Sequence, residues 1–115
     1  MSQRRWTGKY RNRKCEYKGI HFPSKRERDR FIILEDMQAK GEISELRCQV
    51  KFELLEHQKL DGKVVERAVD YIADFTYRDA DGNLVVEDAK GFKTPEYVIK
   101  RKLLLHKYGI RIMEV

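Results

Sequence analysis

Long apolar runs are absent from this 115-residue sequence, and their absence bears on whether the protein enters or crosses a membrane. A membrane-spanning helix needs about 20 consecutive, mainly apolar residues, and the sequence holds no such run. Its basic N-terminus is not followed by the apolar segment of a secretory signal. We therefore expect a cytoplasmic protein with no membrane partner.

Cysteine and histidine are scarce, and the few present are widely spaced. The sequence has two cysteines, Cys15 and Cys48, and three histidines, His21, His57 and His106. None of them has the close spacing of zinc ligands, so a zinc site is not expected. The cysteines are expected to be reduced thiols. No internal repeat or low-complexity linker is visible, and the length suits one domain.

Charge is abundant, with 25 basic against 19 acidic residues and a formal net charge of +6. The 41% of hydrophobic residues come in periodic blocks, which excludes disorder for most of the chain. The basic residues are concentrated at residues 1–19, where aromatic residues are interleaved with them. Such a basic arm predicts DNA binding through phosphates, the alternative being a solvated tail. The DNA-binding candidates in the arm are Arg4, Arg5, Lys9, Arg11, Arg13 and Lys14.

Residues 20–115 have the patterning of an α/β domain. Ser24 as N-cap and Glu27 three residues later form a capping-box pattern at the start of a helix. Two Asp-Gly turns separate alternating segments, and Thr94-Pro95 marks a second helix start. The expected order is a helix to about residue 40, strands at 49–56, 64–78 and 84–90, a helix at 95–107, and a strand at 110–115. This predicts a mixed four-stranded sheet flanked by two helices, with the last strand parallel to an inner one.

Two carboxylates are expected to meet across the second and third strands. Asp74 and Asp88 lie at similar distances from the turn at Asp81-Gly82, which places them side by side on adjacent strands. Lys90 follows Asp88 at a period-two spacing and so shares its face. Paired carboxylates repel unless a cation lies between them, and a hard divalent ion with oxygen ligands satisfies this need.

Such a metal, together with Lys90, would stabilise the charge that develops when a phosphodiester is attacked. The alternative is that Asp74, Asp88 and Lys90 are ordinary exposed residues of a half-solvated sheet. Two acids precede Lys90, and the spacing favours Asp88, since Glu87 should point to the opposite face.

The segments Tyr-Ile-Ala-Asp-Phe at 71–75 and Val-Glu-Asp-Ala-Lys-Gly at 86–91 resemble the motifs of the PD-(D/E)xK, or restriction-endonuclease-like, nuclease superfamily. Ala73 replaces the proline of that motif. The family core, in the order αβββαβ, would cover residues 20–115. More narrowly, the chain is similar to a small group of phage and prophage endonucleases. That group shares a Tyr-Arg-Asn start, a Phe-x-Ser-Lys-x-Glu helix and an Asp-x-Lys-Gly strand end. The resemblance implies Mg²⁺- or Mn²⁺-dependent DNA cleavage in a bacterial host, with branched, Holliday-junction-like intermediates as candidate substrates.

The same resemblance adds Glu27 to the catalytic set Asp74, Asp88 and Lys90, because many members carry an acid on the helix ahead of the strands. Metal ligation would fall to Glu27, Asp74 and Asp88. Glu27 has a competing role as the third residue of the capping box. Gln49 and Asp70 are further candidates for lining the site, the alternative for Gln49 being an exposed strand position.

The second helix carries Lys100, Arg101 and Lys102, which could follow a phosphate backbone or form a solvated face. The functional expectation is a metal-dependent DNA endonuclease that acts as a homodimer and uses no organic cofactor. The alternative is a non-catalytic DNA-binding accessory protein on the same fold.

Overall fold

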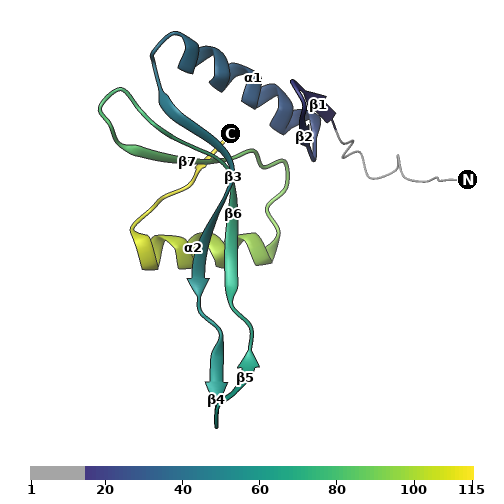
Figure 1. The fold of residues 1–115 in the computed structure, drawn as a ribbon, viewed down its shortest axis with the longest axis vertical. Helices are drawn as coiled ribbons and strands as arrows, with labels where there is room; N and C mark the ends of the chain where they lie inside the picture. Colours follow the sequence, from purple (N-terminus) through teal and green to yellow (C-terminus); the bar gives the residue numbers. More distant parts are fainter. Residues whose placement is uncertain (1–14) are drawn as a thin grey trace, which may run out of the picture.

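The structure is a computed structural model that describes residues 15–115, and its centre is a mixed four-stranded sheet (Figure 1). The strand order is β3-β6-β7-β8. Neighbours are antiparallel except for β7 and β8, which are parallel. This confirms the mixed sheet and the parallel pairing of the last strand. The four strands are β3 (Ser44–Leu55), β6 (Val69–Arg78), β7 (Leu84–Asp88) and β8 (Met113–Glu114).

Two helices, α1 (Lys25–Ala39) and α2 (Pro95–Tyr108), begin and end as the capping residues predict. Ser24 Oγ accepts a hydrogen bond from the backbone of Glu27 at 3.2 Å, and Thr94 Oγ1 accepts one from Tyr97 at 3.1 Å. Gly109 ends α2 with a φ of 70°, a left-handed conformation that glycine adopts without strain.

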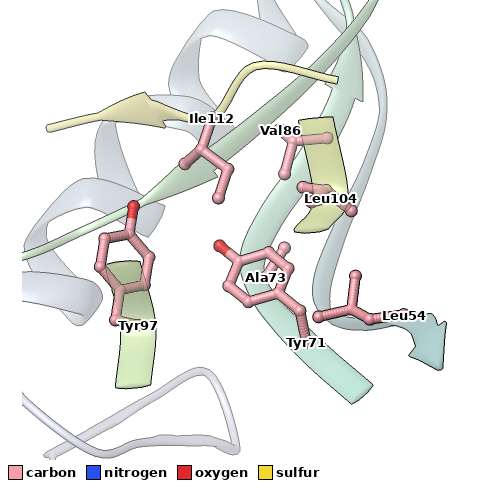
Figure 2. Packing of buried hydrophobic residues seen from close by; sticks show 7 residues of the cluster. All are labelled: Leu54, Tyr71, Ala73, Val86, Tyr97, Leu104 and Ile112. Carbon is pink, nitrogen blue, oxygen red and sulfur yellow. The ribbon is translucent and has the colours of Figure 1, made fainter. Parts of the chain in front are cut away.

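Each helix covers its own hydrophobic cluster. Phe31 and Leu34 of α1 pack with Phe75 and Tyr77 of β6. The second cluster joins α2 to β3, β6, β7 and the segment before β8 (Figure 2). Its buried members are Leu54, Tyr71, Ala73, Val86, Tyr97, Leu104 and Ile112.

The two clusters divide β6 between them, which the alternation alone did not indicate. In a regular strand, residues 69, 71, 73, 75 and 77 would lie on one face of the sheet. As a group, these residues are less exposed than the residues that alternate with them in β6. Tyr71 and Ala73, however, pack with α2, whereas Phe75 and Tyr77 pack with α1. The change occurs at Asp74.

A backbone distortion in β3 lies at the same level. The pairs Cys48↔Phe75 and Val50↔Ala73 place Gln49 opposite Asp74. Gln49 has a φ of 54°, in the left-handed region that a side chain with a Cβ occupies at a cost of about 1–2 kcal/mol. We conclude that the sheet changes direction at the level of Asp74, through strain held in the neighbouring strand.

Several element boundaries differ from those expected. The strand expected at 64–78 is two strands, β5 (Lys63–Glu66) and β6, and β5 forms a hairpin with β4 (Gln58–Leu60). This hairpin extends away from the rest of the fold (Figure 1). β3 begins five residues earlier than 49 because it also pairs with the end of β6. β7 ends at Asp88 rather than at residue 90, and β8 is shorter than 110–115.

The expected arm overlaps the folded unit. β1 (Cys15–Tyr17) pairs with β2 (Ile20–Phe22), and the hydroxyl of Tyr17 donates to Glu35 of α1 at 3.2 Å. The domain therefore includes residues from Cys15 onward, and not only from residue 20. Within residues 15–115, neither helix has the length and apolar character needed to cross a membrane.

Candidate active site

Asp74 and Asp88 are brought together at the point where β6 and β7 separate. The register pairs Phe75 with Glu87, so the next residues outward, Asp74 and Asp88, face each other. Their carboxyl groups are close enough that the charge of Asp88 affects the ionisation of Asp74. The backbone N–H of Ala89 donates to Oδ2 of Asp74 at 2.8 Å. The arrangement agrees with the prediction from the distances to the Asp-Gly turn.

Asp88 is almost fully buried, and its two oxygens have separate partners. The hydroxyl of Tyr71 donates to Oδ2 of Asp88. The ammonium of Lys90 lies 3.4 Å from Oδ1 and 4.6 Å from the centre of the Tyr97 ring. A cation over an aromatic face is favoured electrostatically, so Tyr97 helps to hold Lys90 beside the carboxylate.

Glu27 joins this site from α1. Its carboxylate accepts a hydrogen bond from Nε2 of Gln49 at 3.2 Å and is close enough to Asp74, Asp88 and Lys90 for each to affect its ionisation. Its backbone N–H also donates to Ser24, so the residue takes part in the helix cap. The capping-box pattern predicted that the Glu27 side chain would bond back to the Ser24 backbone. The cap instead uses the Glu27 backbone N–H, and the carboxylate accepts from Gln49.

Burial and mutual repulsion alter the titration of these acids. The pKa of Asp74 is raised from 3.8 to about 8, chiefly because burial disfavours the charged form and then because Asp88 carries a like charge. The pKa of Glu27 is also raised, again mainly by burial. Part of this rise is offset by the hydrogen bond with Asp74 and by the charge of Lys90.

The donor set fits a hard divalent cation in its chemistry. Within residues 15–115, no three His, Cys, Asp or Glu side chains are arranged as a metal-holding group. Mg²⁺, however, is commonly bound through one or two carboxylates, with water and substrate phosphate completing its shell. Asp74 and Asp88 are two such carboxylates. Burial and the like charge of Asp88 raise the pKa of Asp74, and a bound cation would oppose both effects.

Glu87 lies on the opposite face, as its spacing predicted. It is fully buried and accepts two hydrogen bonds from Arg30, each of 2.7 Å, and a third from the hydroxyl of Tyr77. Because both oxygens are occupied by a bidentate guanidinium, Glu87 ties β7 to α1. It is not a member of the carboxylate site.

The other candidate residues are more dispersed. Asp70 lies 4.0 Å from Lys51 and, with Lys90 and Lys100, lines a cavity of about 310 Å³ on the α2 side. Lys100 also pairs with Glu96 at 3.0 Å. The remaining basic residues of α2, Arg101 and Lys102, line a separate hollow near the C-terminus. The arm residues Arg4, Arg5, Lys9, Arg11, Arg13 and Lys14 lie outside the described residues.

Three contributing residues were not singled out from the sequence. The sequence analysis assigned Tyr71, Tyr97 and Arg30 to no site. Tyrosine rather than phenylalanine on an apolar face was the available signal, because a buried hydroxyl requires a partner. For Arg30 no such signal existed, since its partner is 57 residues away.

The chain matches a family described as "Protein of unknown function (DUF1064)", and the match covers residues 7–113. Comparison with curated proteins and with solved structures found no match.

Proposed function

This chain belongs to the DUF1064 family of proteins of unknown function, and we propose that it is a metal-dependent DNA endonuclease. One observation carries the proposal. Asp74 and Asp88 face each other at the ends of adjacent strands, with Glu27 and Lys90 beside them. Carboxylates and a lysine at one point are suited to phosphodiester hydrolysis, because they hold a metal and neutralise developing charge.

Each side chain has a distinct task in this proposal. Asp74 and Asp88, with Glu27, would hold Mg²⁺ or Mn²⁺, which supplies Lewis-acid activation of the phosphate and of a water nucleophile. Tyr71 orients Asp88 by its hydroxyl, and Gln49 orients Glu27 by its amide. Lys90 places a positive charge where the non-bridging phosphate oxygens would lie.

A restriction-endonuclease-like fold is part of the same proposal. The elements α1, β3, β6, β7, α2 and β8 follow one another in the order helix, three strands, helix, strand. That is the order of the family core which the Ala73-Asp74 and Asp88-x-Lys90 motifs resemble. The two additions to this order are short hairpins: β1–β2 before α1, and β4–β5 between β3 and β6.

A non-catalytic DNA-binding protein on this fold is the alternative. Such a protein would have no need of clustered acids, which repel DNA as well as each other. The chain keeps Glu27, Asp74, Asp88 and Lys90 together, so the endonuclease is favoured.

The deciding experiment incubates the purified protein with supercoiled, linear and four-way-junction DNA in the presence of Mg²⁺, Mn²⁺ or EDTA. We expect cleavage with either metal and none with EDTA. Asp74→Asn and Lys90→Ala should abolish cleavage while DNA binding is retained. The controls Asp81→Asn and Lys40→Ala change the same residue types at exposed positions away from the site and should cleave normally. Absence of metal-dependent cleavage on every substrate would contradict the proposal.

A further inference from the structure

A hollow of about 670 Å³ lies between the start of α1 and the loop that follows β7. It borders the candidate active site, because Glu27 and Lys90 form part of its wall. Its volume is in the range of sites that hold one small molecule or one nucleotide. We call it the Phe92 hollow, and its wall consists of residues 23–27, residues 89–92 and Thr94.

Phe92 is the feature of this hollow that the function described so far leaves unexplained. It directly follows Lys90-Gly91, and 77% of its surface is exposed, the highest value among the large apolar side chains of residues 15–115. Tyr97, only five positions later, is buried. A single exposed apolar residue is ordinary, but an aromatic ring on the wall of a hollow beside catalytic candidates is placed where it could stack on a base.

The charged side chains around Phe92 are mainly basic. Lys25 and Arg26 are exposed on the α1 side of the hollow, and Lys90 lies at its inner end. The one acid in the wall, Glu27, belongs to the candidate metal site. The outer part of the hollow therefore favours an anionic ligand, and the ring favours a flat apolar one.

A nucleotide with an unpaired base has both properties. Aromatic side chains stack on bases while basic side chains hold the phosphates, which is how single-stranded nucleic acid is bound. A base inside a duplex is already stacked on its neighbours and cannot offer its face to a ring. A site that stacks a ring on an unpaired base discriminates by strand structure and not by sequence.

We propose that the Phe92 hollow binds an unpaired nucleotide of DNA next to the phosphate that is cut, with Phe92 stacked on its base and Lys25 and Arg26 at its phosphates. The position of the nucleotide rests on the proposed endonuclease function. It makes the substrate a junction between paired and unpaired DNA, rather than a continuous duplex.

The test measures binding by fluorescence anisotropy in EDTA, so that cleavage does not interfere, on single-stranded, splayed-arm and blunt duplex DNA. We expect Phe92→Ala and Phe92→Leu to weaken binding to the first two by about tenfold and to the duplex by less than about twofold. Phe92→Trp in a Trp6→Phe background, which removes the one native tryptophan, should bind as the Trp6→Phe protein does, and its fluorescence should be quenched by single-stranded DNA but not by duplex. Ile33→Ala, a change of an exposed apolar residue that does not line the hollow, is the matched control and should bind as the wild type does.

Equal weakening on all three DNAs, or full binding by Phe92→Leu, would overturn the proposal, since stacking would then not be the cause. A change in sedimentation without a change in DNA binding would also overturn it and assign Phe92 to a protein contact. The wild-type cleavage assay separates this result from the endonuclease proposal. If the wild type cleaves DNA but the Phe92 variants do not weaken binding selectively, only the proposal for the hollow is contradicted. If the Phe92 variants weaken binding selectively but the wild type does not cleave, only the endonuclease proposal is contradicted.

Discussion

Tyr71 and Asp88 are joined by a hydrogen bond from the tyrosine hydroxyl to Oδ2 of the aspartate, inside the cluster that α2 covers. Figure 2 shows the Tyr71 ring in this cluster near Tyr97, and the ring centres are 6.4 Å apart. Oδ2 of Asp88 accepts this bond, and the other oxygen, Oδ1, lies beside the ammonium of Lys90. Tyr71 is therefore a positioning residue for the site.

Tyr71→Phe is expected to lower cleavage while the fold is retained. The ring still fills its place, but Oδ2 of Asp88 loses its donor and the carboxylate is less well oriented. Loss of one buried hydrogen bond costs about 1–3 kcal/mol. We expect kcat to fall about tenfold or more with little change in KM, since the loss acts on the site and not on DNA binding. Tyr108→Phe removes the hydroxyl that donates to the Glu53 carbonyl, at the surface, and is the matched control.

The pH dependence of stability tests the burial of Asp74. Its pKa is raised from 3.8 to about 8, so between these values the folded protein holds a proton that the unfolded chain has released. The free energy of unfolding should therefore fall as pH rises from about 4 to about 8. Asp74→Asn, which cannot ionise, should show a smaller fall.

Urea unfolding with EDTA at several pH values measures this difference. Adding Mg²⁺ above pH 8 should stabilise the wild type and leave Asp74→Asn unaffected, because a cation replaces the proton between the carboxylates. Parallel pH curves for the two proteins would contradict the assigned burial. A wild type that Mg²⁺ does not stabilise would contradict the metal site.

Gln49 is predicted to lower the stability of the fold through its backbone and to support cleavage through its side chain. Its left-handed backbone is strained, and its amide holds Glu27. Gln49→Gly should relieve the strain and leave the protein at least as stable as Gln49→Ala, which keeps the strain. Both variants should cleave DNA more slowly because Glu27 loses its donor. The unfolding midpoints and cleavage rates of Gln49→Gly and Gln49→Ala test both expectations. A glycine variant less stable than the alanine variant would contradict the assignment of backbone strain to Gln49.

The Arg30–Glu87 pair is expected to dominate the stability of the contact between α1 and β7. Arg30→Ala leaves a fully buried carboxylate without its cation, which costs about 3–5 kcal/mol. Arg28→Ala breaks a pair with Asp29 of similar length at the surface, where water screens the charges and the pair adds little to stability. Denaturant unfolding distinguishes the two. Similar losses in both variants would show that Glu87 is not held by Arg30.

Dimer formation is a further prediction, because one site cuts one strand and symmetric cleavage of two strands needs two. The β4–β5 hairpin is the candidate contact, since its Leu60, Val64 and Val65 are largely exposed and a two-stranded hairpin is marginal alone. Leu60→Asp should shift the protein toward monomer in sedimentation and reduce double-strand cutting more than nicking. A wild type that is monomeric both free and on DNA would count against the dimer.

Much of this architecture follows from local pattern. Ser24 and Thr94 mark the starts of the helices, and the Asp-Gly turn at 81–82 sets the register that brings Asp74 beside Asp88. These are contacts between near neighbours or across one tight turn, where residue type and spacing suffice. The same reasoning separated Glu87 from Asp88, because alternate residues of a strand point to opposite faces.

The sequence by itself thus determined the elements, the mixed sheet and the pairing of Asp74 with Asp88. Tertiary structure alone decided the strained bend at Gln49, the division of β6 between two clusters, the Tyr71 contact with Asp88 and the ion pair of Arg30 with Glu87. Each of these depends on which distant elements pack together, and packing is a property of the whole core and not of any local pattern. The carboxylates could therefore be found from spacing, whereas the groups that orient them could be found only in the fold.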